Sequence, residues 1–213
     1  MSGSPLLLAL HSSSETLGVA VQPLGLTAAD AKVESFPLGR RLSNALLPCV
    51  EQVLPADQWP QLGRLAVATG PGGFTGTRLT VVLARTLAQQ LAIPLHGFSS
   101  FLLIARRLLA ETDPSLTGQR LWLEQVLPSR GSVVGCYGLD PAALGGVAEL
   151  EPPRLVRPEE RWGGDAPSYP AVVDSAADAL QLLELAQLAA AAHLAGPWAP
   201  VLPLYPTSPV EGL

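Results

Sequence analysis

The segment LAVATGPGGFTGTRLTVVLARTLAQQL, residues Leu65–Leu91, decides the fold of this chain. Its first residues, Leu65–Thr69, are an apolar run that predicts a buried strand. A glycine-rich turn follows, and the residues from about Thr75 onward have the spacing of an amphipathic helix. A strand, a glycine turn and a helix in this order often place an anion at the helix N-terminus. The segment therefore raises the choice between a phosphate-binding loop and a turn that positions a helix.

The glycine turn departs from the known phosphate-binding patterns. A P-loop needs GxxxxGK[ST], and the residues after Gly70 contain no lysine and have a different spacing. The dinucleotide pattern GxGxxG fails because Thr75 occupies the position of the third glycine. The alternative is that the glycines form a tight turn and Arg78 pairs with a carboxylate such as Glu15. The residues that remain candidates for binding an anion are Gly72, Gly73, Thr75 and Arg78.

The predicted helix carries two stripes of different size. A stripe of small residues lets a neighbouring helix approach closely, and a stripe of leucines lies beside it. Periodicity does not decide whether the stripes face a partner or the chain's own core. The small stripe is Gly76, Thr80, Ala84 and Ala88, and the bulky stripe is Leu79, Leu83, Leu87 and Leu91.

The elements around this segment predict a mixed sheet of the ribonuclease-H-like kind, because a meander of strands precedes crossover helices. A helix is expected from Ser43, as its cap, to about Leu54, with Pro48 kinking it or moving its start. We place a first lobe at residues 1–98 and a smaller second lobe at 99–213. The expected strands of the first lobe are 6–10, 17–21, 32–36, 65–69 and 93–97.

The second half has a less regular pattern. A helix at 100–109 is expected to precede a hairpin at 120–127 and 133–139, and residues 141–170, rich in Pro, Gly and Glu, are expected to be mostly loop. A short strand at 171–173 leads to a long Ala/Leu helix at 175–194, capped by Ser175. Five prolines beyond residue 196 predict an extended tail.

The composition excludes several classes of protein. Hydrophobic residues make up 48% of the 213 residues and charged residues 15%, so a sizeable core and some apolar surface are expected. The formal net charge is -5 and the one lysine is Lys32, which argues against nucleic-acid binding by the chain alone. Cys49 and Cys136 belong to no metal pattern and are interpreted as free thiols. The apolar run near the N-terminus is too short for a signal peptide or a membrane span, so we expect a cytoplasmic protein.

The sequence contains few candidates for catalysis. His11, His96 and His193 form no metal-binding motif, and Ser12–Ser14 lie in no GxSxG elbow. We therefore expect no catalytic residue, no metal and no cofactor.

Five segments, in order, match one family. They are LLLALHSSSETLGVAV, LLPCVEQVL, LAVATGPGGFTGTRLTVVLARTLAQQL, IPLHGFSSF and VLPLYPTSPVE. Together they resemble the TsaB (YeaZ) family of the bacterial tRNA threonylcarbamoyladenosine system. The match is specific over Leu6 to about Phe101, and GPGxFTGxR followed by a small-residue helix is its strongest part.

The resemblance implies a two-lobed ASKHA-type fold and a non-catalytic role. It implies a larger TsaD paralogue that carries the metal and modifies adenosine in tRNA, and a TsaE ATPase. The tRNA is reached only through that complex, and a homodimer is also implied. The contact surface is expected on the helices near 43–54 and 75–91. Its expected residues are Leu46, Val50, Val53, Thr80, Ala84 and Leu87.

Three positions depart from the family pattern. His11 stands where the family usually has Asp, Leu42 where it often has His, and LPSRGSVV at 127–134 replaces a more acidic motif. An imidazole is no substitute for a carboxylate on magnesium, so these changes favour a scaffold. The alternatives are an ATP-binding ASKHA-type enzyme that holds phosphate with Gly72, Gly73 and Arg78, a glycoprotease-like hydrolase, and a homodimeric structural protein unrelated to tRNA.

Overall fold

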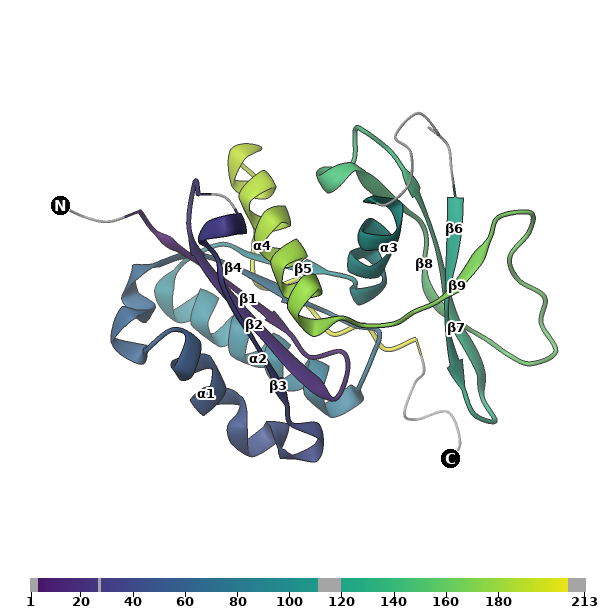
Figure 1. Cartoon of the computed structure of the whole chain (residues 1–213), viewed down its shortest axis with the longest axis horizontal. Helices are drawn as coiled ribbons and strands as arrows, with labels where there is room; N and C mark the ends of the chain where they lie inside the picture. The colour runs from purple at the N-terminus through teal and green to yellow at the C-terminus, as the bar shows by residue number, and fades with distance from the viewer. Residues whose placement is uncertain (1–3, 27, 111–119, 207–213) are drawn as a thin grey trace. The chain divides into compact units, whose positions relative to one another are not determined.

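The computed structural model describes residues 4–26, 28–110 and 120–206. These residues form two compact units (Figure 1). The first combines Met1–Ser100 with Val173–Pro203, and the second combines Phe101–Val172 with Leu204–Leu213. No helix in the described ranges is long and apolar enough to cross a membrane.

The first unit is built on a five-stranded mixed sheet with the order β3-β2-β1-β4-β5. β1 pairs antiparallel with β2 and parallel with β4, and β2 pairs antiparallel with β3 while β4 pairs parallel with β5. This is the predicted ribonuclease-H-like arrangement, in which a meander is followed by crossover connections. The strands are β1 Leu6–His11, β2 Thr16–Pro23, β3 Lys32–Pro37, β4 Leu62–Ala68 and β5 Leu95–Phe98.

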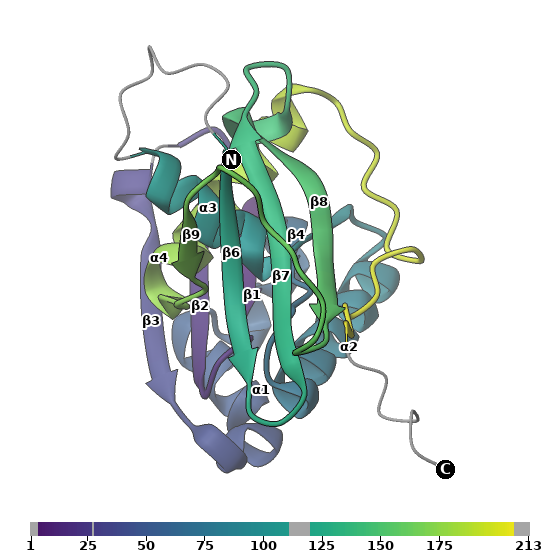
Figure 2. The ribbon, with the colours of Figure 1, turned by 90° about the vertical axis from the view of Figure 1, so that its right-hand side faces the viewer.

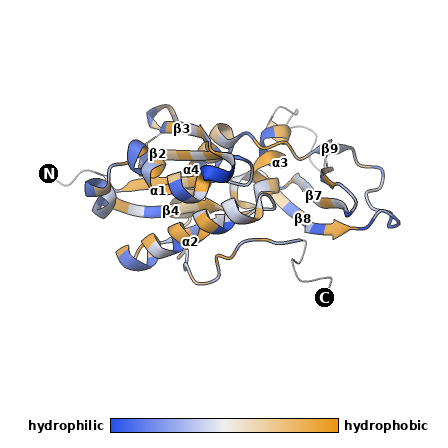
Figure 3. Cartoon of the chain, turned by 90° about the horizontal axis from the view of Figure 1, so that it is seen from below, coloured by the Kyte–Doolittle hydropathy of each residue, from blue (hydrophilic) through white to orange (hydrophobic). Residues whose placement is uncertain are grey.

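Helices cover both faces of this sheet (Figure 1). On one face lie α1, Leu42–Val53, and α2, Phe74–Leu91, and on the other lies α4, Ser175–Ala191. Successive residues of β2 point to opposite faces of the sheet. Val19 and its odd-numbered neighbours therefore join the core under α1 and α2. The even-numbered Gly18 faces α4, because a Cβ added to it would meet Ser175. Apolar and polar residues alternate along α2 accordingly (Figure 3).

The ends of the helices differ in detail from the sequence-based expectation. α1 begins at Leu42 without a side-chain cap and runs through Pro48, so Ser43 is not its N-cap. α4 is capped by Asp174, whose carboxylate accepts a hydrogen bond from the amide of Ala177 at 3.1 Å, and not by Ser175. In both cases the predicted cap lies within the helix.

The second unit contains nearly all of α3, Ser100–Ala110. It also contains a four-stranded mixed sheet of order β8-β7-β6-β9 (Figure 2). β6, Arg120–Leu127, pairs antiparallel with β7, Gly131–Leu139, and parallel with β9, Ser168–Pro170. The prediction of a hairpin here is confirmed, while the short strand lies slightly earlier than expected.

The expectation that residues 141–170 are mostly loop is wrong, because β8 spans Val147–Val156. Pro152 and Pro153 argue against a central strand, but β8 is an edge strand, where a missing N–H donor costs little. The register with β7 shifts on either side of Cys136, which accommodates the prolines.

The long Ala/Leu helix and the C-terminal tail both pack against elements of the first unit. α4 packs on β1 and β2, and the amide of Leu95 donates to Gly196 O at 2.8 Å, while Val201 is buried in the core of the first unit. The first unit is therefore made from both ends of the chain, whereas the sequence-based boundary assigned residues 99–213 to the second lobe. The described tail contains no helix, as its prolines predict.

Candidate functional site

Polar residues of the first unit gather after the carboxyl ends of its parallel strands. His11 ends β1 and is followed by three serines, β4 leads through Thr69 into the glycine turn, and β5 is followed by Ser99 and Ser100. In open α/β sheets ligands bind at this edge, where the strand order changes direction. This edge is therefore the place to look for chemistry.

The glycine turn packs directly against the serine turn that follows β1. The amide of Gly73 donates to Ser13 O at 3.1 Å, and a Cβ on Gly72 would lie 2.1 Å from the same oxygen. A Cβ on Gly76 would lie 2.9 Å from Ser12 O. Glycine is thus needed at position 72 because two stretches of backbone meet there, as the tight-turn interpretation expects.

The four candidate anion-binding residues lie together at the start of α2. Gly73 is the helix N-cap, Thr75 and Arg78 in the first turn are exposed, and Gly72 is half-buried. The Gly73 amide is already bonded to Ser13 O, so the turn offers an anion fewer donors than a free N-terminus does. Anion binding by Gly72, Gly73, Thr75 and Arg78 stays a prediction.

Buried and half-buried hydroxyl groups connect the strand ends to the helices. Ser12 Oγ and Thr80 Oγ1 are 2.7 Å apart, and Ser14 Oγ lies 3.2 Å from Ser175 Oγ of α4. Ser100 Oγ donates to Pro71 O at 2.6 Å. These bonds hold β1, α2 and α4 together at this edge of the sheet.

Three further hydroxyls at this edge are buried and have no hydrogen-bond partner within the ranges that the structure describes. They belong to Ser13, Thr77 and Ser99, which follow β1, begin α2 and follow β5. Buried polar groups are rarely unpaired, so these three are places where a water or a ligand can be accommodated. No sequence motif singles out Thr77 or Ser99, because their burial depends on tertiary packing.

His11 faces the carboxylate of Asp178, in the first turn of α4. His11 Nε2 lies 3.8 Å from Asp178 Oδ2, and both side chains are fully buried. Asp178 Oδ2 also accepts the amide of Asp174 at 3.0 Å. The pair ties the end of β1 to the first turn of α4, and its burial separates it from solvent.

His96 lies in a structural contact between β5 and β4. It is hydrogen-bonded to Arg64 of β4, whose guanidinium also donates to Leu194 O at 3.2 Å. Burial, together with the positive charge of Arg64, lowers the pKa of His96 to about 4. The imidazole is therefore neutral near pH 7 and accepts the bond from Arg64. Among the residues placed in the structure, no group of three or more metal-ligating side chains occurs.

The six residues expected at a partner surface do not lie on the surface. All six are buried in the core of the first unit, because they lie on the sides of α1 and α2 that face the sheet: Leu46, Val50, Val53, Thr80, Ala84 and Leu87. Such residues cannot contact a partner without opening the core. The outward side of the same helices instead presents Leu47, Phe74 and Val82, with exposed fractions of 48%, 44% and 52%.

Two curated proteins with the same name have sequences similar to this chain. The chain is 38% identical over 98 residues to the tRNA threonylcarbamoyladenosine biosynthesis protein TsaB of Bacillus subtilis, and 29% identical over 129 residues to that of Escherichia coli. These relatives support the resemblance to the TsaB (YeaZ) family. These alignments cover 44% and 55% of the chain.

The chain spans about half the length of the curated TsaB relatives it matches, 41% and 54% of them. Residues 38–117 match a family model described as TsaD, tRNA N6-adenosine threonylcarbamoyltransferase. This range includes α1, the glycine turn and α2.

Solved structures support the fold over nearly the whole chain. YeaZ from Pseudomonas aeruginosa superposes with a TM-score of 0.71 at 22% identity, covering 94% of this chain and 99% of that one. An uncharacterized protein with similarity to peptidase YEAZ from the same organism gives 0.73 at 23% identity, covering 95% and 100%. The ASKHA-type fold class expected from the sequence is confirmed.

Proposed function

We propose that this chain is a non-catalytic subunit required by a TsaD-like partner for threonylcarbamoylation of adenosine in tRNA. The observation that carries the proposal is the similarity of about half of the chain to proteins named for threonylcarbamoyladenosine biosynthesis. A TsaE-like ATPase would complete the system, and tRNA would be reached through the complex.

The packing at the strand ends supports an accessory role. The Gly73 amide and the Ser12 and Ser14 hydroxyls contact groups of the chain itself, and His11 and Asp178 are paired away from solvent. A nucleophile and its base must instead reach a substrate. These polar groups therefore hold the first unit together and leave the partner to supply the chemistry.

The outward side of α1 and α2 is the surface we assign to the partner. Leu47 and Val82 are each about half exposed on neighbouring helices that rest on the core through their other side. Arg78, also exposed on α2, adds a charge at the rim. An apolar centre with a charged rim is the usual composition of a protein interface. A second copy of the chain can use the same surface, which gives a homodimer.

The direct test is a reconstitution of tRNA threonylcarbamoylation with the TsaD-like and TsaE-like proteins of the same organism. Product should form when this chain is present and fall to background when it is omitted. The chain by itself should give no product. Equal product formation without the chain would overturn the proposal.

A second candidate, an ATP-binding ASKHA-type enzyme, is favoured by the unpaired hydroxyls of Ser13, Thr77 and Ser99 at the strand ends. Those groups lie beside the glycine turn, where Gly72 and Arg78 would meet a phosphate. Magnesium-dependent ATP binding by the isolated chain, weakened by Thr77→Val, would support this candidate. Absence of binding at millimolar ATP would exclude it.

A further inference from the structure

One edge of the first sheet is left open by the described residues. β3, Lys32–Pro37, is the outermost strand of the order β3-β2-β1-β4-β5 (Figure 2). In an edge strand, the backbone N–H and C=O groups of every second residue point away from the sheet. Within the described ranges, no backbone hydrogen bond joins Lys32–Pro37 to an element other than β2. The outward groups of β3 are therefore available to a further strand.

The other sheet edges are protected in ways that natural proteins use against strand pairing. At the edge strand β5, the amide of Leu95 donates to the C-terminal tail at 2.8 Å. β8 contains Pro152 and Pro153, which have no N–H, and its register with β7 shifts. β9 is short, Ser168–Pro170. β3, in contrast, keeps an unbroken register with β2, and its one proline, Pro37, is its last residue.

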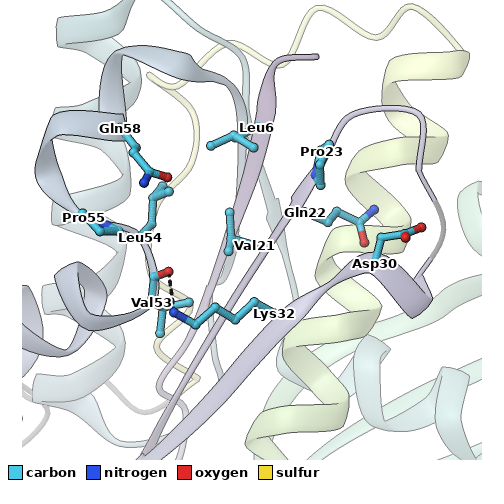
Figure 4. A pocket seen from close by; sticks show the side chains of 10 residues that line it. All are labelled: Leu6, Val21, Gln22, Pro23, Asp30, Lys32, Val53, Leu54, Pro55 and Gln58. Carbon is cyan, nitrogen blue, oxygen red and sulfur yellow. Dashed lines mark hydrogen bonds between the residues drawn. The ribbon is translucent and has the colours of Figure 1, made fainter. Parts of the chain in front are cut away.

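β3 carries two opposite charges on one face of the sheet. Lys32 pairs with Val21 of β2 and Glu34 with Val19, and both valines belong to the core under α1 and α2. Lys32 and Glu34 therefore lie on that face, and both are exposed. Lys32 Nζ donates to Val53 O at 3.0 Å (Figure 4) and to the preceding carbonyl at the same distance. These bonds use two of the three donors of the ammonium group.

These charges are complementary to those of a second β3. The carboxylate of Glu34 makes no ion pair or hydrogen bond among the described residues. Two antiparallel copies of β3 are related by a two-fold axis perpendicular to the sheet. Directly opposed residues lie on the same face, so one residue must face its own copy at the axis. With Lys32 or Glu34 at the axis, like charges oppose each other, and a centre farther along the strand opposes neither charge to the other. With Val33 at the axis, Lys32 of each copy faces Glu34 of the other.

We propose that β3 pairs with β3 of a second copy of the chain, antiparallel and centred on Val33, so that the two first sheets become one continuous sheet. The half-buried Val33 side chains meet on the face that α4 covers, and the two Lys32–Glu34 pairs on the other face set the register. An edge-to-edge contact involves far fewer residues than the ~20–30 a side of a stable interface, so the dimer is reversible. The inference goes beyond the proposed function and does not depend on it.

The test is sedimentation equilibrium of the full chain at concentrations from about 10 µM to about 1 mM, the range of weak association. A monomer–dimer equilibrium is expected. A homodimer through the outer side of α1 and α2 would give the same result, so the measurement is repeated with Leu47→Arg and Val82→Arg combined. The dimer should persist in this double variant. A wild-type chain that stays monomeric at about 1 mM, or a dimer that is lost in the double variant, would overturn the proposal.

A charge reversal on β3 locates the contact. Glu34→Lys sets lysine against Lys32 in both opposed pairs and should weaken dimerisation at least about tenfold. Glu159→Lys makes the same change of charge at an exposed position of the second unit, and it should leave dimerisation unchanged. Thermal unfolding checks that both variants are folded. Equal dimerisation by the two variants would contradict pairing through β3.

A mixture of two variants tests the register. Lys32→Glu carries two glutamates on this face of β3 and Glu34→Lys two lysines, so each variant alone should associate weakly. Mixed in equal amounts they should form a heterodimer, because both opposed pairs again join opposite charges. A mixture that associates as weakly as its components would contradict the register centred on Val33. Lys32→Glu also loses the bonds to the end of α1; if it does not fold, the comparison of Glu34→Lys with Glu159→Lys decides the proposal.

Discussion

The two sides of α1 and α2 both carry apolar residues, yet they have different environments. The inner side, which includes Val50 and Ala84, is fully buried against the sheet, while the outer side presents Leu47 and Val82 at about half exposure. The inner side fixes the fold of the first unit, and the outer side is available to another molecule. A stripe of small residues on a helix therefore indicates close packing, but it does not distinguish packing on the chain's own sheet from packing on another molecule.

The largest expected effect comes from placing a charge on the inner side. Ala84→Arg should lower the free energy of unfolding by about 4 kcal/mol or prevent folding, because a buried guanidinium has no partner there. Urea unfolding followed by circular dichroism measures the change. Val82→Arg is the matched control on the outer side. If the two variants had equal unfolding free energies, the inner and outer sides of α2 would not differ in burial as described.

The glycine turn before α2 gives the next effect. Gly72→Ala should cost about 2 kcal/mol of stability, because its Cβ would meet Ser13 O at 2.1 Å and the backbone must shift. Gly73→Ala should cost less, about 0.5–1 kcal/mol, since its Cβ meets nothing within 4 Å and the loss is only that Ala is a poorer N-cap than Gly. The pair of variants is compared by thermal unfolding. A reversed order would mean that the turn is not packed as described.

A smaller effect is expected from pH. The pKa of His96 is about 4 in the folded chain and near 6.5 when unfolded, so the unfolded chain binds more protons between these values. Stability is therefore fully present above pH 6.5 and decreases as the pH falls toward 4. Titration of the imidazole resonances by NMR should show His96 protonating near pH 4. His96→Phe should flatten the pH dependence.

The sequence predicted most elements of the first unit because its patterns are local. The apolar run at Leu65, the helical spacing after Thr75 and the meander of strands each have a period that fixes an element. The edge strand β8 was missed because Pro152 and Pro153 hide its alternation, and only its position at the edge of the sheet makes them tolerable.

The candidate site was predictable only where its residues are adjacent in sequence. The glycine turn and the serines after β1 were singled out from their motifs. The pairing of His11 with Asp178 joins residues far apart in the chain, and the unpaired hydroxyls of Thr77 and Ser99 depend on packing that no local pattern encodes. The side of α1 and α2 that faces the sheet was likewise decided by tertiary packing.

The affinity of this chain for its TsaD-like partner, determined by isothermal titration calorimetry, shows directly whether the outer side of α1 and α2 binds that partner. Leu47→Arg combined with Val82→Arg should weaken binding at least about tenfold while the unfolding free energy stays within about 0.5 kcal/mol of the wild type. Ser35→Arg, on the exposed edge strand β3, is the control and should bind normally. Wild-type affinity in the double variant would contradict the claim that the outer side of α1 and α2 holds the partner.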